Sequence, residues 1–448
     1  MSELKDIAAH LVDIAGREGA DDVIAEATDS RTHLVRFSNS EIDAVNSWEE
    51  SYVQMFVAVG KRTLASDLRD MGNLDSLVRA LVSSAGRAPE NKGYGGIASG
   101  RFKYRPCRAD RAIVNIKDPS KHVHDSISAA ESEGADNVGG TLYIRHTRTG
   151  IASTGGALAS DESAAAELSV RAFSQPEASG QAVSCTSRLS SLAAGRAGAR
   201  AGELSVKAKD PVQGEQGKFD IIIEPLFLGS VMHSTMRRMS ALYVDIGMSM
   251  YAKKIGKKVA SKEVTIVDDP TIPSISQRAF DHEGMPTRRN VLVKDGVLKT
   301  YLHGTSTAKR FKTKSTANAG TFIPTLFTIP TEPTAFHPVV EPGDWKTDEI
   351  ISDTKRGLYL NNTWYTRYQD YSTGEFSTIP RDAILRIEDG EIVGAAKNIR
   401  VSDNMLNLWK SVDAVSRSSE EVFWWDEASP PSTLPTLRIR QMNITRSS

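Results

Sequence analysis

The chain has little cysteine and no long hydrophobic run. Its only cysteines, Cys107 and Cys185, stand far apart and in no CxxC pair, which excludes a disulfide framework and fits a reducing compartment. No apolar stretch reaches the roughly 20 residues that a membrane-spanning helix requires. The first residues do not resemble a secretory leader. We therefore expect a cytoplasmic protein with no membrane partner.

An excess of charge of one sign is also missing. The formal net charge is −1 for 448 residues, so no overall field attracts nucleic acid, and no nucleic-acid partner is expected. The hydrophobic share of 40% and the charged share of 25% are typical of folded proteins. The length suffices for two or three domains.

Phosphate-binding loops, dinucleotide fingerprints and nucleophile elbows are absent as well. The glycine-rich segment GYGGIASG (93–100) lacks the strand–turn–helix setting that would place it under a phosphate, so we expect a loop there. Neither cysteine has a neighbour that would activate a thiolate. The basic cluster KRFKTK (309–314) could attract an acidic peptide or a phosphate, although such a run is usually a solvated loop.

What is present first is a repeated unit in the N-terminal half. Apolar residues at helical spacing predict two helices, each followed by Glu-Gly-Ala-Asp, at 18–21 and 133–136, and then by a strand. Further helices are expected after a cap at Asn73 and through Leu189, Leu192 and Ala193. We interpret residues 1–206 as an α/β domain that contains this duplicated helix-EGAD-strand unit.

The predicted secondary structure changes to mainly β after the polar segment KAKDPVQGEQGK (207–218), which is predicted to be a linker. Residues 219–448 contain a buried-strand run and two hairpins that turn on Asp-Gly, with one helical stretch over roughly 227–256. The expected fold class is α+β: an N-terminal α/β domain with helices on a sheet, and a mainly antiparallel β C-terminal domain with a long helix.

The segment DHEGMPTRRN (281–290) begins like a zinc-peptidase helix. That signature needs a second histidine four residues after the first, and Pro286 stands there and interrupts a helix. Gly284 and the proline instead predict a turn into the following hairpin. A looser metal site that combines His282 and Glu283 with His303 stays open as an alternative, although no further ligand is evident.

Aromatic residues gather in YLNNTWYTRYQDYSTGEFS (358–376). Trp364, Tyr365 and Tyr368 are interleaved with small polar residues, which suits a loop that binds a peptide or a subunit. Alternation along a strand predicts equally that half of these side chains fill the core.

Several long stretches of the second half resemble the TldD/PmbA family, in particular its TldE (PmbA) branch. They are KKVASKEVTIVDDPTIP (257–273), FDHEGMPTRRNVLVKDGVLKTYLHGTSTAKR (280–310), STANAG (315–320) and TGEFS (373–377). The resemblance implies a two-subunit zinc peptidase that acts on unfolded or modified peptides. In the TldD branch a helix carries the zinc-binding sequence HExxxH, with a later cysteine as a further ligand.

At the matching place this chain reads HSTMRR (233–238), after FDIIIEPLFLGSVM. His233 occupies the first ligand position, Ser234 replaces the glutamate base, and Arg238 replaces the second histidine. Both cysteines lie in the N-terminal half, so the late thiolate is missing too. One imidazole beside a permanent cation supplies neither a zinc site nor a base, so no metal is expected on this chain and it should not be a peptidase alone.

The sequence therefore favours the non-metal-binding subunit of a TldD/TldE-type metallopeptidase, with zinc on a TldD-type partner. His282, Glu283, Arg288, His303, Trp364, Tyr365 and Tyr368 are the expected substrate-binding or subunit-docking residues, and no catalytic residue is expected. The alternatives are a homodimeric binding or scaffold protein without a peptidase role, and a self-sufficient metal hydrolase that uses His282, Glu283 and His303.

Overall fold

A computed structural model describes residues 2–322 and 330–446. The N-terminal part forms a six-stranded antiparallel sheet in the order β3-β2-β1-β4-β5-β6. Long strands that alternate around tight turns build this sheet. Its members are β1 (Asp22–Ser38), β2 (Glu41–Val59), β3 (Arg62–Leu68), β4 (Asn137–Ser153), β5 (Leu158–Gln175) and β6 (Ala178–Thr186).

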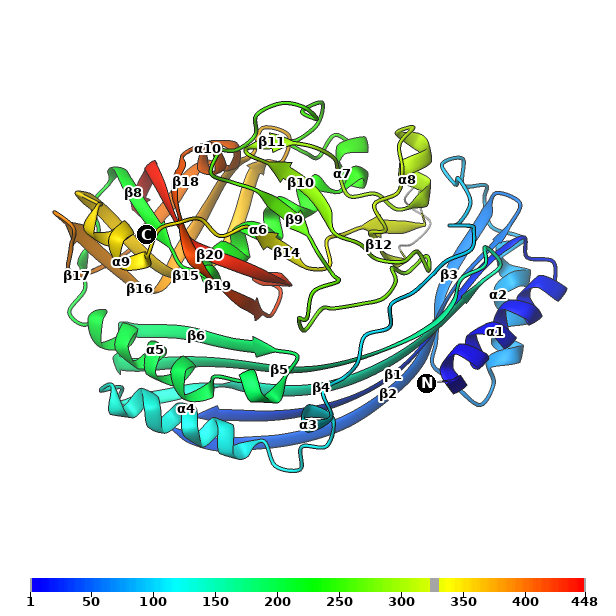
Figure 1. The fold of residues 1–448 in the computed structure, drawn as a ribbon, viewed down its shortest axis with the longest axis horizontal. Helices are drawn as coiled ribbons and strands as arrows, with labels where there is room; N and C mark the ends of the chain where they lie inside the picture. The colour runs from blue at the N-terminus through cyan, green and yellow to red at the C-terminus, as the bar shows by residue number, and fades with distance from the viewer. Residues whose placement is uncertain (1, 323–329, 447–448) are drawn as a thin grey trace.

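Helices pack at both ends of this sheet (Figure 1). One end holds α1 (Ser2–Arg17) and α2 (Leu74–Ala85), and the other holds α3 (Arg111–Val114), α4 (Ser120–Ser132) and α5 (Ala194–Lys207). In each EGAD segment the glycine, Gly19 or Gly134, has a positive φ, of 95° or 96°, and the chain then enters a strand. Glycine adopts this conformation at little cost, and helices commonly end this way.

Two glycines let α5 lie directly against α4. A Cβ atom at Gly198 would sit 1.9 Å from the Ser126 carbonyl oxygen, and one at Gly202 would sit 2.5 Å from that of Ala130. Any larger residue would push the helices apart and open the apolar layer beneath them, to which Val123, Ile127 and Ala201 belong.

The C-terminal part is built on a second, larger sheet, in which most pairs are antiparallel. Central β8 runs parallel to β15 and antiparallel to β20, and the apolar side chains of Ile221 and Ile223 enter the core. The strands of this sheet are β7 (Val212–Gln213), β8 (Gly217–Ile223), β9 (Ile266–Asp268), β10 (Asn290–Lys294), β11 (Val297–Leu298), β14 (Pro338–Val340), β15 (Arg356–Asp370), β16 (Glu375–Glu388), β17 (Glu391–Lys397), β18 (Ile399–Asn404), β19 (Val412–Trp424) and β20 (Ala428–Arg446).

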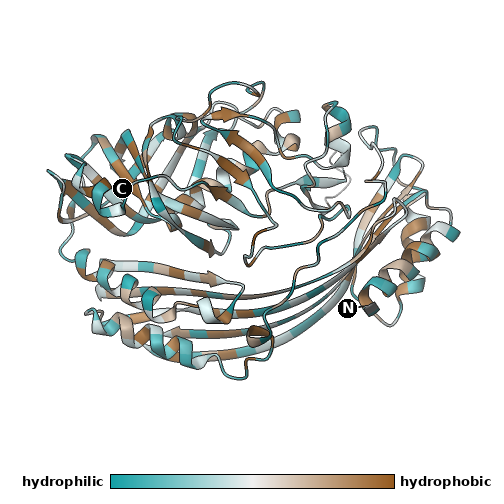
Figure 2. Cartoon of the chain, viewed as in Figure 1, coloured by the Kyte–Doolittle hydropathy of each residue, from teal (hydrophilic) through white to brown (hydrophobic). Residues whose placement is uncertain are grey.

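A separate pair, β12 (Ala319–Phe322) and β13 (Thr331–Pro333), lies beside the main sheet, and five helices complete the C-terminal part. They are α6 (Pro225–Met239), α7 (Ala241–Asp245), α8 (Thr305–Arg310), α9 (Thr347–Ser352) and α10 (Met405–Lys410). The longest, α6, packs across β15, β19 and β20. Figure 2 shows apolar residues distributed along the strands of both sheets, and the buried ones include clusters that combine residues of both parts, such as Leu204 with Leu385 and Phe56 with Phe280. The expected α+β class is confirmed.

Three local predictions need correction. The helix expected through Leu189 and Leu192 is a 3₁₀ turn, Leu189–Ser191, and the α-helix begins only at Ala194. The helical stretch over 227–256 ends early, because α6 stops at Met239 and α7 at Asp245. Asn73 stands at the N-cap position of α2, but its side chain accepts no capping hydrogen bond.

Residues 207–218 connect α5 to the second sheet and contribute a short strand to it. α5 ends at Lys207, β8 begins at Gly217, and the short strand β7 between them pairs with β17. The division into domains at this segment stays a prediction. Among the helices of residues 2–322 and 330–446, none combines the length and apolarity that crossing a bilayer requires.

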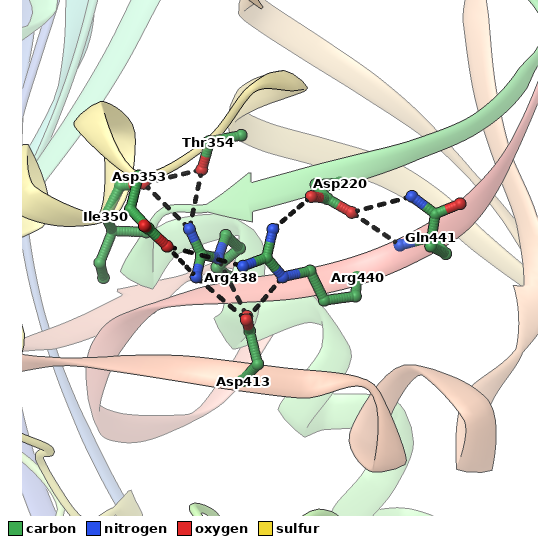
Figure 3. Close-up of polar contacts among 8 residues, drawn as sticks. All are labelled: Asp220, Ile350, Asp353, Thr354, Asp413, Arg438, Arg440 and Gln441. Atoms are coloured by element: carbon green, nitrogen blue, oxygen red, sulfur yellow. Dashed lines mark hydrogen bonds and ion pairs between the residues drawn. The ribbon is translucent and has the colours of Figure 1, made fainter. Parts of the chain in front are cut away.

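A buried arginine ties the C-terminal sheet to its covering helix (Figure 3). Arg438 on β20 is 1% exposed and donates from Nε and Nη2 to the two carboxylate oxygens of Asp413, both at 3.0 Å. Its Nη2 also lies 2.8 Å from Asp353, and its Nη1 donates to Thr354. Arg440 extends this network from Asp413 to Asp220 on β8.

Replacement of Arg438 by Met should lower the free energy of unfolding by about 3 kcal/mol, because it removes one partner from a buried ion-pair network. Asp353 and Asp413 remain partly exposed and can rehydrate, which keeps the loss near the lower end of the usual range. Denaturant unfolding measures the change. The matched control is Arg417→Met, at an exposed arginine that forms no ion pair within the described residues, and it should shift stability by less than about 0.5 kcal/mol. Equal losses of unfolding free energy in both variants would show that the Arg438 network does not stabilise the fold.

Candidate functional site

Residues 281–286 form a tight turn and no helix. The Gly284 amide donates to the Asp281 carbonyl, and the Asp281 amide donates to that of Met285. Gly284 has φ +79°, and a Cβ atom there would lie 2.4 Å from the Ala157 Cβ atom. Only glycine fits this position, because both the backbone angle and the contact with Ala157 exclude a side chain.

The two carboxylates of this turn are buried, and each accepts hydrogen bonds from neighbouring segments. Asp281 accepts hydrogen bonds from the amides of Glu283, Met285 and Ala319. Glu283 is 1% exposed and accepts from the Thr305 amide and the Thr331 hydroxyl. Burial raises the pKa of Asp281 to about 8, with the nearby Glu283 carboxylate adding to the effect, and burial also raises the pKa of Glu283. The turn thereby connects α8, β12 and β13.

His282 joins the turn to the N-terminal sheet. Its Nδ1 lies 2.8 Å from Oε2 of Glu26 on β1, and since a carboxylate only accepts, the imidazole donates. Burial alone would raise the pKa of Glu26, but the hydrogen bond and charge of His282, helped by Arg278, lower it below its usual value. The two side chains are 13% and 5% exposed, so the contact is largely dry.

Two further contacts fix the same junction. Asp161 on β5 accepts from the amides of Cys107 and Ala279, at 2.7 and 2.8 Å. The Tyr104 hydroxyl donates to the Gly284 carbonyl at 2.7 Å. We call residues 279–285, together with Glu26, Tyr104 and Asp161, the central joint.

The other residues expected near this hairpin have different environments. Arg288 is exposed and donates to the Ser315 carbonyl. His303 is 1% exposed and lies between the rings of Tyr301 and Phe311, and its Nδ1 has no hydrogen-bond partner in the described part of the chain. Burial lowers the pKa of His303 to about 4, so the ring is neutral near pH 7. Glu283 and His303 are both buried, and their role in binding stays a prediction.

The HSTMRR segment lies on α6. His233 Nδ1 donates to the Ser429 carbonyl at 2.9 Å, and Ser234 is buried. Arg238 is 4% exposed, with its guanidinium carbon 4.3 Å from the Tyr243 ring centre and 4.2 Å from that of Tyr371. Its Nη1 also donates to the Met248 carbonyl at 3.0 Å.

These residues do not fit a metal ion. The guanidinium of Arg238 is a permanent cation held between two rings, so it offers no lone pair to a metal, and His233 alone is too few ligands for a zinc site. Over residues 2–322 and 330–446, no three His, Cys, Asp or Glu side chains lie close enough together to hold a metal ion.

The aromatic segment on β15 divides into buried and exposed side chains. Trp364 is half-buried and packs against Trp424, with ring centres 5.4 Å apart, while Arg171 lies over its face. Tyr368 is also half-buried, and burial raises its pKa. Tyr365 is 47% exposed and faces solvent.

Sequence patterns did not reveal two parts of this region. Trp424 stacks on Trp425, which is 64% exposed, and these residues from β19 and the turn after it extend the aromatic cluster. A cavity of about 370 Å³ lies between α5 and the C-terminal sheet, where Arg200 donates to Glu224 and Tyr359. Both depend on contacts between distant segments, such as Trp424 with Trp364 and Arg200 with Tyr359, which no local spacing signals.

The comparisons with known proteins agree with this architecture. The model of the PmbA/TldA metallopeptidase C-terminal domain matches residues 216–446, about half of the chain. The chain therefore belongs to the PmbA/TldD family of metallopeptidases, which confirms the resemblance seen in the sequence.

Individual relatives show how far the similarity extends. A metalloprotease of Methanothermobacter thermautotrophicus is 32% identical over 49% of this chain and 47% of its own length. A metalloprotease TldD homolog of Buchnera aphidicola (subsp. Acyrthosiphon pisum) is 29% identical over 44% of this chain and 41% of its own. The chain thus spans about half the length of the curated relatives that it matches. The crystal structure of TldE from Thermococcus kodakarensis shares the fold, with a TM-score of 0.86, 18% identity, and coverage of 98% of this chain and 99% of that one.

A double-mutant cycle on Glu26→Ala and His282→Ala should give a coupling energy of about 1.5–3 kcal/mol, because a buried charged hydrogen bond is stronger than an exposed one. The measurement is the free energy of unfolding of the two single variants and the double variant. The exposed pair His10 and Asp75, 3.1 Å apart, is the control and should couple by less than about 0.5 kcal/mol. Coupling equally small at Glu26 and His282 would show that the joint does not depend on this contact.

The variant His303→Leu should gain stability relative to the wild type as pH falls from 6.5 to 4. The folded-state pKa of His303 is lowered to about 4, so between these values the unfolded chain binds the proton and the folded chain does not. The wild type therefore loses stability on acidification through this group, by up to about 1.4 kcal/mol per pH unit, and the variant does not. Paired unfolding curves at several pH values measure the difference, and a difference independent of pH would contradict a buried neutral His303.

Proposed function

We propose that this chain is the non-metal-binding subunit of a TldD/TldE-type metallopeptidase that cleaves unfolded or modified peptides. The observation that carries the proposal is the state of α6, where the family's metal position holds a half-buried His233, a buried Ser234 and a stacked Arg238. Family membership supports a metallopeptidase role, and this helix argues against a metal on this chain.

The partner would supply the chemistry. A zinc ion held by a TldD-type subunit would polarise the scissile carbonyl and activate water, with a glutamate of that subunit as the base. This chain would close one wall of the chamber. The central joint would keep the two sheets at a fixed separation, and Arg238 would keep α6 in place through Tyr243 and Tyr371.

The exposed aromatic residues are the proposed peptide contacts. Tyr365, Tyr371 and Trp425 are 47%, 38% and 64% exposed, and each presents a flat apolar surface with a polar edge. Trp364 is less exposed and packs against this group through its ring contacts with Tyr365 and Trp424. An extended peptide could bind such a surface without a fixed sequence, as an enzyme acting on unfolded chains requires.

The test is a cleavage assay with an unfolded peptide and a TldD-type partner that carries HExxxH. We expect cleavage only when the partner and this chain are mixed, and no cleavage by this chain with added zinc. Tyr365→Ala combined with Trp425→Ala should raise KM several-fold and leave kcat nearly unchanged, because these residues bind the peptide without contacting the reacting bond. His233→Ala should leave the activity of the mixture unchanged.

Two results would overturn the proposal. Equal cleavage by the partner with and without this chain would favour a binding or scaffold protein. Stoichiometric zinc on the purified chain, lost in His282→Ala, would favour a self-sufficient metal hydrolase.

A further inference from the structure

The C-terminal part carries a strongly basic surface that the proposed function does not use. Residues 246–262 contain five lysines and no acidic residue, and residues 296–316 contain five lysines or arginines and again no acidic residue. In a chain of net charge −1 this is a marked local excess of one sign. The second segment includes the KRFKTK cluster, and the first is its neighbour in space.

Backbone contacts bring the two segments together. Lys258 and Val297 form an antiparallel bridge, the Gly256 amide donates to the Leu298 carbonyl at 2.8 Å, and the Leu298 amide donates to that of Lys257. Further along, the Tyr301 hydroxyl donates to the Tyr251 carbonyl. Figure 1 shows β11 and α7 on the upper side of the C-terminal part, while α8 lies nearer the N-terminal part, where its Lys309 donates to the Gly95 carbonyl.

Seven lysines on this side have no ion-pair partner among the described residues, and six of them are exposed, with Lys254 half-buried. We call them the lysine surface: Lys253, Lys254, Lys257, Lys258, Lys299, Lys312 and Lys314. Asp245 borders this surface and pairs with Arg310, at 2.8 Å, and Asp295, in the turn before β11, is an exposed carboxylate beside it, so lysines outnumber acids there.

Exposed aliphatic side chains lie among these charges. Ile255, at the centre of the KKIGKK turn, is 51% exposed, and Ile246 and Met248 are 42% and 37% exposed. Lysines that surround exposed aliphatic groups match a partner that carries both carboxylates and apolar side chains. The phosphate backbone of a nucleic acid offers no aliphatic partner, and arginine forks, which bind phosphates in bidentate fashion, are not part of the lysine surface.

The lysine surface adjoins the α6 region. The Ala241 amide donates to the Leu302 carbonyl at 3.0 Å, so the segment that follows Lys299 runs past the end of α6. Met248 accepts a hydrogen bond from Arg238 on α6, and Arg238 is stacked on Tyr371. A chain bound on the lysines would therefore continue toward Tyr371 and the other exposed aromatic residues.

From this arrangement we infer that the lysine surface binds acidic segments of unfolded peptides that also contain apolar residues, so the substrate class is peptides of net negative charge. The inference rests on the proposed function, because it takes an unfolded peptide as the substrate. Long-range attraction would raise the encounter rate, and the aliphatic side chains would hold the peptide after encounter.

The experiment is fluorescence anisotropy on the full chain, without a partner, using a labelled unfolded peptide of Asp, Glu, Leu, Ser and Gly. A matched peptide with Gln and Asn in place of the acids is the comparison. At low salt we expect about tenfold tighter binding of the acidic peptide, and this preference should shrink as NaCl approaches 0.5 M, where screening acts within about 4–5 Å.

Two triple variants test whether the binding preference depends on the lysine surface or only on the net charge of the chain. Lys253→Glu, Lys257→Glu and Lys258→Glu together should abolish the preference for the acidic peptide. Lys61→Glu, Lys92→Glu and Lys121→Glu, at exposed N-terminal lysines, change the net charge equally and should preserve it. Circular dichroism and thermal unfolding establish that both variants are folded. Ile255→Ser should weaken binding of the acidic peptide and leave its salt dependence unchanged.

Several outcomes would overturn the inference. They are equal weakening by both triple variants, no preference for the acidic peptide, and tighter binding of duplex DNA or of phosphatidylserine vesicles that only the first triple variant abolishes. Failure of the proposed function looks different, because it appears as missing cleavage in the mixture with the partner while this binding persists. Loss of the binding preference with intact cleavage would refute only the inference made here.

Discussion

One buried turn, residues 281–285, joins the C-terminal part to β1 of the N-terminal sheet, in addition to the direct contacts that β6 makes with β15, β16 and β19. Its carboxylates accept hydrogen bonds from the C-terminal part, and its imidazole donates to Glu26 of the N-terminal sheet. An unpaired carboxylate in such a site would cost several kcal/mol, so each group is kept only because all of its partners are present. These contacts fix the start of α8 and of β12 against the turn.

The same saturation explains why His282 and Glu283 are poor metal ligands here. A catalytic metal needs donors with free lone pairs that converge on one open position. The donors of this turn point in different directions, toward Glu26, Thr305 and Thr331. His282 and Glu283 resemble metal ligands in the sequence, but in the structure they make structural hydrogen bonds: His282 to the N-terminal sheet and Glu283 within the C-terminal part.

Much of the fold follows from local signals. Gly19, Gly134 and the Asp-Gly pairs mark turns at which the chain reverses, and they placed the strands and hairpins correctly. The family assignment also came from contiguous stretches. The sequence could not indicate that Arg438 would find Asp413 and Asp353, that Glu26 would find His282, or that Trp424 would pack on Trp364. Those contacts arise from the sheet register over separations of 25 to 256 residues.

In the proposed role, the α6 segment illustrates how a metal position can be replaced without loss of shape. By the resemblance, Arg238 stands where the second histidine ligand would be, and its guanidinium, fixed between Tyr243 and Tyr371, has no lone pair to give a metal. Arg238 stacks on Tyr371, in the turn between β15 and β16, and this contact holds that turn against α6. In the proposed role, this contact preserves the surface for a peptide while the chemistry moves to the partner.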